Sequence, residues 1–241
     1  MNNTLLYFSN DDDFNLNISL SKNKEELKQN LIRTLNENES NMKIFQVSID
    51  YCKQQISKYK HLEETDRTNK NITYKLSAFR NQYYIWNFAA FINLISMDLK
   101  TLQIGLYFAE TEWQKRFYAR FLYTLVYESI HDILDFFGKD FKNLLKTKYY
   151  SKLDNITLKD LRKRINNFKV EYIGLAHKIR NNTFAHKDHE VLSQIDIITN
   201  INWFKTIETA ITFESILNDI GNYLQKLIKE GSLHLQDVYQ E

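Results

Sequence analysis

Apolar residues along most of the chain recur at steps of three and four, which is the period of an amphipathic helix. One stripe of this kind consists of Met42, Phe45, Ile49, Cys52, Ile56 and Tyr59. A second, the most regular in the sequence, consists of Leu158, Leu161, Ile165, Phe168, Tyr172, Leu175 and Ile179. A seam with this spacing packs lengthwise on another helix at a shallow angle. The pattern therefore predicts long helices that lie side by side.

Polar segments mark the predicted boundaries in the first part of the chain. Residues 1–20 show little periodicity, and we expect a loose arm or a short extended segment there. A helix is expected from Ser21, followed by a second helix after the polar stretch at 36–40. Residues 63–71 form the next predicted loop.

Two further long helices are expected, and the second has recognisable signals at both ends. The segment 73–100 is apolar nearly all round, which indicates a helix in a central position. Thr111 and Gln114 have the spacing of a capping box at the start of another long helix. Gly138 is expected to supply the left-handed residue that ends that helix.

The helix with the most regular stripe begins with a cap signal at Thr157 and Asp160. A last helix is expected before Gly231, with apolar residues at Phe213, Leu217, Ile220, Leu224 and Leu227. No strand pattern is present. The expected fold is all-α: a helical bundle formed by 73–241, preceded by an N-terminal arm and helical extension, 1–72.

Composition agrees with this interpretation, because the 241 residues include no proline and only five glycines. The most apolar window, 83–97, is shorter than the ~20 residues that span a bilayer and contains Asn87 and Asn93. The single cysteine, Cys52, excludes an internal disulfide and fits a reducing compartment. The first residues lack the pattern of a signal peptide, so we expect a cytoplasmic protein without membrane contact.

One short stretch, 177–190, carries candidate chemistry; it reads HKIRNNTFAHKDHE. On the simpler interpretation, Arg180 complements the carbonyl end of a helix dipole and an asparagine closes the helix. A break at the asparagine pair would also let His186 fold back towards Arg180, whereas an unbroken helix would leave them about 120° apart. Arginine binds phosphate oxygens through its planar fork, and histidine exchanges protons near neutral pH. The pair therefore suits phosphodiester chemistry.

The string RNNTFAH resembles the signature of the HEPN superfamily, which is arginine, a polar residue, four more residues and histidine. The match falls on Arg180, Asn181 and His186, and the flanking Ala-His-x-Asp at 185–188 looks like the abortive-infection branch. The resemblance covers roughly residues 73–230. It implies a metal-independent endoribonuclease without cofactors, often the toxin of a toxin–antitoxin or phage-defence system.

The resemblance also implies roles for the matched residues. His186 would activate a ribose 2′-hydroxyl against the adjacent phosphate, Arg180 would hold that phosphate, and Asn181 would orient the histidine or donate to the phosphate. The expected products are a 2′,3′-cyclic phosphate and a 5′-hydroxyl. Relatives of this kind are usually homodimers with facing motifs, and dimerisation would supply the second imidazole that acid–base chemistry requires.

Further side chains are candidates for RNA contact: His177, Lys178, Lys187, Arg162 and Arg164. His177 lies on the same side of the helix as Arg180, although a histidine there is more often structural. The basic residues before the motif would contact phosphates without regard to sequence, or they form a solvated helix face.

A metal site is not expected. His186, Asp188 and His189 match no known ligand framework. Glu128 and His131 have the Glu-x-x-His spacing of di-iron bundles, but such sites need two copies of it. These two residues are therefore interpreted as helix-pair contacts or the rim of a cleft.

Expected partners are RNA, a second copy of the chain and an antitoxin, either a nucleotidyltransferase or another protein. The alternative is a catalytically inactive HEPN-like module that dimerises or binds RNA or protein. A third interpretation, a purely structural helical module, requires Arg180 and His186 to be incidental.

Overall fold

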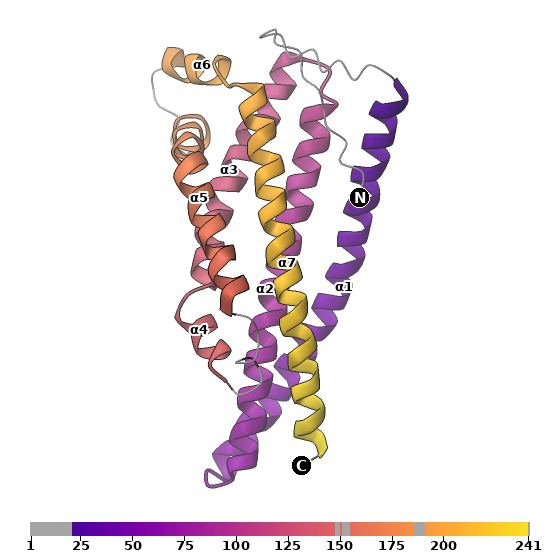
Figure 1. Ribbon diagram of the computed structural model, residues 1–241, viewed down its shortest axis with the longest axis vertical. Coiled ribbons are helices and arrows are strands. Elements are labelled where there is room, and N and C mark those ends of the chain that lie inside the picture. The colour runs from indigo at the N-terminus through magenta and orange to yellow at the C-terminus, as the bar shows by residue number, and fades with distance from the viewer. Residues whose placement is uncertain (1–20, 148–149, 151–154, 186–190, 241) are drawn as a thin grey trace.

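The computed structural model describes residues 21–147, 150, 155–185 and 191–240 (Figure 1). Within these residues every regular element is helical and no strand occurs, so the predicted all-α fold is confirmed. The elements are α1 (Ser21–Thr65), α2 (Lys70–Tyr107), α3 (Glu112–Phe136), α4 (Lys139–Leu145), α5 (Asn155–Arg180), a π turn (Asn181–Ala185), α6 (Val191–Thr199) and α7 (Trp203–Gln240).

Helix α2 occupies the centre of the bundle, as its apolar sequence predicts. It packs against α1, α3 and α7, and α5 packs against α3 and α7 (Figure 1). The main core contains residues such as Phe88, Ile92 and Leu99 of α2, together with Leu122 of α3 and Phe213 of α7. In the described part of the chain, no helix is both long and apolar enough to cross a membrane.

The predicted break at 36–40 is wrong, because α1 runs unbroken through this polar stretch. The stretch contains no glycine or proline, and Ser40 Oγ donates back to Asn36 O at 2.9 Å. Asn38 instead joins α1 to α2: its Nδ2 donates to Ser96 Oγ at 3.1 Å, and its carbonyl accepts from Asn93 Nδ2 at 2.7 Å. Polar residues in this segment thus form tertiary contacts rather than a loop.

The predicted loop at 63–71 is shorter than expected, since α1 ends at Thr65 and α2 begins at Lys70. Asn69 forms the N-cap of α2, and its side chain accepts from the backbone amides of Asn71 and Ile72. This cap satisfies amides that would otherwise have no partner in the first turn.

The capping box at the start of α3 is confirmed. Thr111 Oγ1 accepts from the Gln114 amide at 3.2 Å, and Gln114 Oε1 accepts from the Thr111 amide at 3.0 Å. The prediction for Gly138 is wrong, because its φ is −70° and no described residue has a positive φ. Glycine is suited to this position because a Cβ would lie 2.7 Å from Asp135 O. Gly138 is the N-cap of α4, a short helix that the pattern did not predict.

Helix α5 begins at Asn155, ahead of the predicted cap at Thr157. The predicted end of the last helix is wrong as well, because α7 continues through Gly231 to Gln240. Gly231 is buried where α7 meets Gln82 and Tyr150, and a Cβ built there would overlap both side chains. The glycine permits close approach between helices and does not end one.

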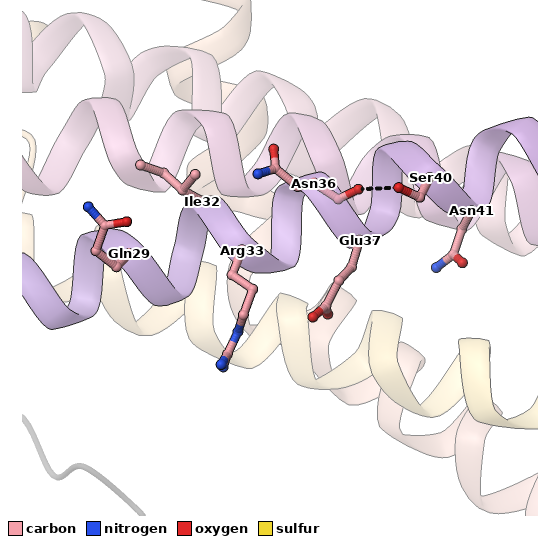
Figure 2. A pocket seen from close by; sticks show the side chains of 7 residues that line it. All are labelled: Gln29, Ile32, Arg33, Asn36, Glu37, Ser40 and Asn41. Atoms are coloured by element: carbon pink, nitrogen blue, oxygen red, sulfur yellow. Dashed lines mark hydrogen bonds between the residues drawn. The ribbon is translucent and has the colours of Figure 1, made fainter.

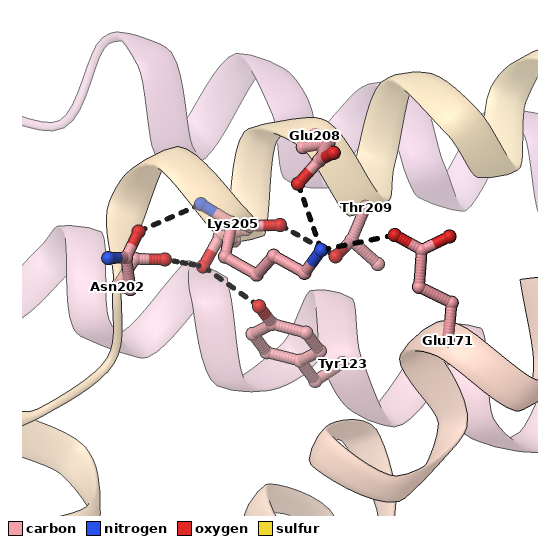
Figure 3. A network of polar contacts seen from close by, with 7 residues as sticks. Tyr123, Glu171, Asn202, Lys205, Glu208 and Thr209 are labelled. Carbon is pink, nitrogen blue, oxygen red and sulfur yellow. Dashed lines mark hydrogen bonds and ion pairs between the residues drawn. The ribbon is translucent and has the colours of Figure 1, made fainter.

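The start of α7 is anchored by a network of polar contacts (Figure 3). Asn202 Oδ1 accepts from the Lys205 amide at 2.9 Å, and Asn202 O accepts from Thr206 Oγ1 at 2.8 Å. Thr206 Oγ1 also lies 3.3 Å from the buried Tyr123 Oη of α3, and Lys205 Nζ lies 3.4 Å from Glu171 of α5. These contacts fix α7 against both α3 and α5.

Cys52 lies in the interface between α1 and α2, as expected of a residue on the first apolar stripe. Its side chain is 2 % exposed, and burial raises the pKa of its thiol to about 11. The thiol therefore remains protonated near neutral pH and behaves as a small packing group.

We predict that Gly231→Ala destabilises the protein by about 1–3 kcal/mol, because the added methyl forces Gln82 away from Tyr150 in a packed interface. Gly174→Ala is the matched control: a Cβ there meets nothing within 4 Å, so helix propensity should stabilise it by roughly 0.5–1 kcal/mol. Urea denaturation followed by circular dichroism measures both. Equal effects of the two substitutions would contradict the packing role of Gly231.

Candidate functional site

The chain does not break at the asparagine pair, contrary to the sequence-based expectation. Helix α5 is regular up to Arg180, and the following residues form a π turn. Asn182 Nδ2 donates to Lys178 O at 2.7 Å, and Thr183 Oγ1 donates to Ile179 O at 2.7 Å. These bonds attach the polar side chains to the preceding turn and keep the backbone helical. The left-handed asparagine of the simpler interpretation is also absent from the described residues.

His186 and Lys187 lie outside the described residues, as do Asp188 and His189. The convergence of Arg180 and His186 therefore stays a prediction. The structure does describe the surroundings of Arg180 and Asn181, and these surroundings come largely from α3.

Arg180 lies against a polar face of α3. Its Nη2 is 2.7 Å from Glu128 Oε1, its Nη1 donates to Asn181 Oδ1 at 2.9 Å, and its guanidinium is 5.5 Å from the centre of the Tyr127 ring. The side chain of Arg180 is 29 % exposed and that of Glu128 is 50 % exposed. The arginine is thus oriented by three partners while it remains accessible to solvent.

Asn181 joins this arginine to His177. A guanidinium only donates hydrogen bonds, so the Asn181 oxygen must face Arg180 and its amide nitrogen must face the histidine. Asn181 Nδ2 lies 2.7 Å from His177 Nε2, which therefore accepts. The neutral His177 ring then carries its proton on Nδ1. Among the described residues, Asn181 orients His177. The orientation of His186 by Asn181, which the resemblance implies, stays a prediction, because His186 lies outside the described residues.

A second imidazole, that of His131, also contacts Tyr127. His131 Nδ1 is 2.7 Å from Tyr127 O, and it must donate because a carbonyl only accepts. The Tyr127 ring centre lies 4.7 Å from that of His131 and 5.3 Å from that of His177. We call the group Tyr127, Glu128, His131, His177, Arg180 and Asn181 the Arg180 cluster.

The cluster changes one inference from the sequence. Dimerisation was expected partly because a lone motif supplies only one imidazole. Since His131 and His177 both lie within the Arg180 cluster, a single chain carries additional proton-exchanging groups near the arginine. The need for a second imidazole no longer requires a second copy.

The sequence places Glu128 and His131 at the rim of a cleft or in a helix contact, but it does not point to Tyr127. Glu128 and His131 lie about one turn apart on α3, so their shared face was visible in the sequence. Tyr127 carried no comparable signal among fifteen tyrosines.

Two of the candidate RNA-binding residues lie away from the cluster. Arg162 Nη2 donates to Phe137 O at 2.9 Å, while Arg164 pairs with Asp219 and donates to Ser215 Oγ at 3.1 Å. Both precede Arg180 by about four to five helical turns, or roughly 25 Å along α5. They connect α5 to the end of α3 and to α7. Lys178 is exposed in the last turn of α5.

An exposed row of aromatic side chains lies on the first half of α3, at steps of four residues: Trp113, Phe117 and Phe121. We call this row the aromatic stripe. Arg120 lies over it, 5.6 Å from the ring centre of Trp113 and 5.9 Å from that of Phe117. Burial lowers the pKa of Arg120, which still keeps its charge at neutral pH.

A hollow of about 410 Å³ joins the aromatic stripe to the Arg180 cluster. Its lining includes Phe121 at one end and Glu128 at the other, with Thr124 and Leu125 between them on α3 and Asp98 on α2. Stripe, hollow and cluster therefore follow one face of α3.

The described residues contain no group of three or more histidine, cysteine or acidic side chains arranged to hold a metal ion. Among the described residues, Arg180 is the cationic side chain that both the sequence and the geometry single out at the motif.

Comparison with protein-family models, with curated proteins and with solved structures gave no match to this chain. The function is therefore inferred from the motif and from the geometry of the Arg180 cluster.

Proposed function

We propose that this protein is a HEPN-type, metal-independent endoribonuclease that acts in the cytoplasm as part of a bacterial toxin–antitoxin or phage-defence system. The observation that carries the proposal is the Arg180 cluster. The charged Arg180 side chain is held at the end of α5. It is linked through Asn181 to one imidazole, His177, and it contacts Tyr127, as does a second imidazole, His131. RNA cleavage by its own 2′-hydroxyl requires these groups: a cation for the phosphate and proton-exchanging rings.

In the proposed reaction, His186 removes the proton from a ribose 2′-hydroxyl, whose oxygen attacks the adjacent phosphorus. The bond from phosphorus to the 5′-oxygen breaks, and a second imidazole, in its imidazolium form, returns a proton to that oxygen. His131 is the described candidate that can carry this proton with its contacts intact, because its Nδ1 already donates to Tyr127 O. Arg180 binds the non-bridging oxygens and stabilises the charge that develops on them. The products are a 2′,3′-cyclic phosphate and a 5′-hydroxyl.

The ion pair with Glu128 is compatible with phosphate binding by Arg180. Within the described residues the guanidinium uses two of its five N–H donors, one towards Glu128 and one towards Asn181. A half-exposed pair of this kind contributes only about 0–1 kcal/mol to stability. A phosphate can therefore replace the carboxylate at little cost.

The aromatic stripe supports single-stranded RNA as the substrate. Unpaired bases stack on exposed aromatic rings, and arginine beside such rings adds an attraction for both base and phosphate. Residues four apart on a helix are separated by about 6 Å along its axis. A strand lying on Trp113 and Phe117 would continue across the hollow towards Arg180.

Helix α6 supports the proposal of a homodimer. Its exposed residues include Val191, Leu192 and Ile195, with Leu192 81 % exposed. The helix contacts the π turn and α3, so this apolar surface borders the motif. A second copy would cover it and bring two motifs together. An antitoxin, a nucleotidyltransferase or another protein, would then neutralise the dimer.

The alternative is an inactive HEPN-like module that dimerises or binds RNA or protein. The specific observation in its favour is that Arg180 is already paired with Glu128 and Asn181, an arrangement that also suits a structural contact between α3 and α5. The first two experiments below separate the two functions.

We predict that His186→Ala and Arg180→Ala each lower RNA cleavage at least about 100-fold. Activity of the unaltered protein should persist in a chelator, with 2′,3′-cyclic phosphate ends identified by mass spectrometry. Arg80→Ala, which removes an exposed arginine of α2, is the control and should retain full activity. Cleavage that both motif substitutions leave unchanged would rule out the assigned site.

We predict that Glu128→Gln, in the inactive His186→Ala background, tightens RNA binding by up to about tenfold, because a carboxylate no longer competes with phosphate for Arg180. Arg180→Ala in the same background should weaken binding. Fluorescence anisotropy with a labelled single strand measures both, and thermal melting checks that stability changes by less than about 1 kcal/mol. If both variants lose stability while RNA binding stays constant, the pair is structural.

We predict that Leu192→Asp converts the dimer to a monomer, because it places a charge in the apolar surface of α6. Val170→Asp is the matched control, since Val170 on α5 is 87 % exposed and lies away from α6. Light scattering after size-exclusion chromatography distinguishes the two masses. An unaltered protein that is monomeric at all concentrations would refute the dimer.

A further inference from the structure

A second hollow, with a volume of about 620 Å³, lies between α1, α2 and α7. None of its lining residues belongs to the motif at 177–190. Its lining is rich in carboxamides, which come from all three helices: Asn38, Asn41, Asn93, Asn218, Asn222 and Gln225. We call it the amide groove. Its volume falls in the range of pockets that hold small organic molecules.

None of the described residues that line the amide groove is charged, although 26 % of the residues in the chain are charged. Asparagine is frequent throughout this sequence, but lysine and arginine together number 32. If the amides lined the groove only because asparagine is common in this chain, the basic residues, which are at least as common, should line it as well. The groove therefore suits a neutral ligand that offers both donors and acceptors.

One wall of the groove is aromatic. The rings of Phe45 on α1 and Trp86 on α2 lie 5.9 Å apart, centre to centre, and both side chains are half-buried. They provide a surface on which a flat ring can pack.

Gly221 keeps the opposite wall open. Glycine inside a helix costs up to about 1 kcal/mol relative to alanine, and Gly221 differs from the equally open Gly174 of α5 in that it lines a groove. Close approach of a neighbour does not explain the glycine, because a Cβ at Gly221 would meet nothing within 4 Å. A side chain at position 221 would instead project into the groove and fill part of its space.

The carboxamides divide into two groups. Asn38 and Asn93 take part in the bonds that hold α1 against α2, and so fix the shape of the groove. The amides of Asn41, Asn222 and Gln225 are exposed, and the described part of the chain gives them no hydrogen bond. These amides can pair with a ligand without breaking a contact within the protein.

A carboxamide presents a donor beside an acceptor, which matches a heterocycle edge with the complementary pair. Asparagine and glutamine make this two-bond contact with N6 and N7 of adenine. We propose that the amide groove binds an adenine base, which packs against the Phe45–Trp86 wall and pairs with the exposed amides. The base is presented as a free nucleoside or as an unstacked base of a nucleic-acid strand.

The described hollow next to the groove on α1 carries side chains of both charges. This hollow shares Asn41 and contains Arg33 and Glu37, whose side chains project from α1 on one side (Figure 2). Their opposite charges offset one another. A 5′-phosphate on the nucleoside should therefore add little affinity.

Isothermal titration of the full chain with adenosine tests the proposal, with uridine and adenosine 5′-phosphate as comparison ligands. A DNA hexanucleotide with one adenine, and its abasic counterpart, form a second arm that no 2′-hydroxyl reaction can cleave. Adenosine should bind saturably and at least about tenfold more tightly than uridine, because the single ring of uracil covers less of the Phe45–Trp86 wall although its edge also pairs with a carboxamide. Equal binding of uridine would rule out adenine as the specific ligand. Adenosine 5′-phosphate should bind no more tightly than adenosine. Because adenosine contains no phosphodiester, this result is independent of the proposed nuclease activity.

Gly221→Leu should fill the groove and weaken adenosine binding at least tenfold, whereas Gly174→Leu on α5 should leave it unchanged. Asn41→Leu with Asn222→Leu removes two exposed amides and should give the same loss if Gly221→Leu fails to fold. Binding of the hexanucleotide alone, lost in the abasic strand and in the groove variants, would assign the base to a strand. Absence of binding in both arms, or binding that the groove variants leave intact, would overturn the proposal.

Discussion

Helix α2 imposes the main constraint on this structure, because an element that is apolar nearly all round must be covered on most of its surface. The covering comes from α1, α3 and α7, and α5 is then held by α3 and α7. This arrangement makes α3 a shared element: one face lies on the core, while its outer face carries Glu128 towards Arg180. The placement of the Arg180 cluster therefore follows from the need to bury α2.

Periodicity predicts the long helices well, because the residues that generate it are the residues that are buried. The stripe on α5 is buried at every position except Leu175. Leu175 is exposed and Ala176 is buried in its place. A strict alternation of three and four averages 3.5 residues per turn, whereas a straight helix has 3.6, so the contact face drifts along a long helix. The deviation is a consequence of helix geometry.

What the sequence does not predict depends on partners from distant parts of the chain. The polar stretch at 36–40 remains helical because Asn38 meets Ser96, and Gly231 lies inside a helix because it meets Gln82. At the candidate site, Arg180 and Asn181 could be found from spacing because they are neighbours in one motif. Tyr127 could not, since its relation to Arg180 exists only after α3 and α5 have packed together.

The π turn after Arg180 has a consequence for how this chain can vary. A π turn holds one residue more than an α turn, and such turns are frequent at functional sites. Removing a single residue from 181–185 would allow ordinary α-helical bonding, although it would also shift the buried Thr183 if made before that residue. The residues of the turn that follow the deletion would rotate about the axis of α5 by about 100°. A homologue that keeps the helix but lacks this extra residue would have different side-chain directions at the end of α5. Any chemistry that depends on those side-chain directions would be lost.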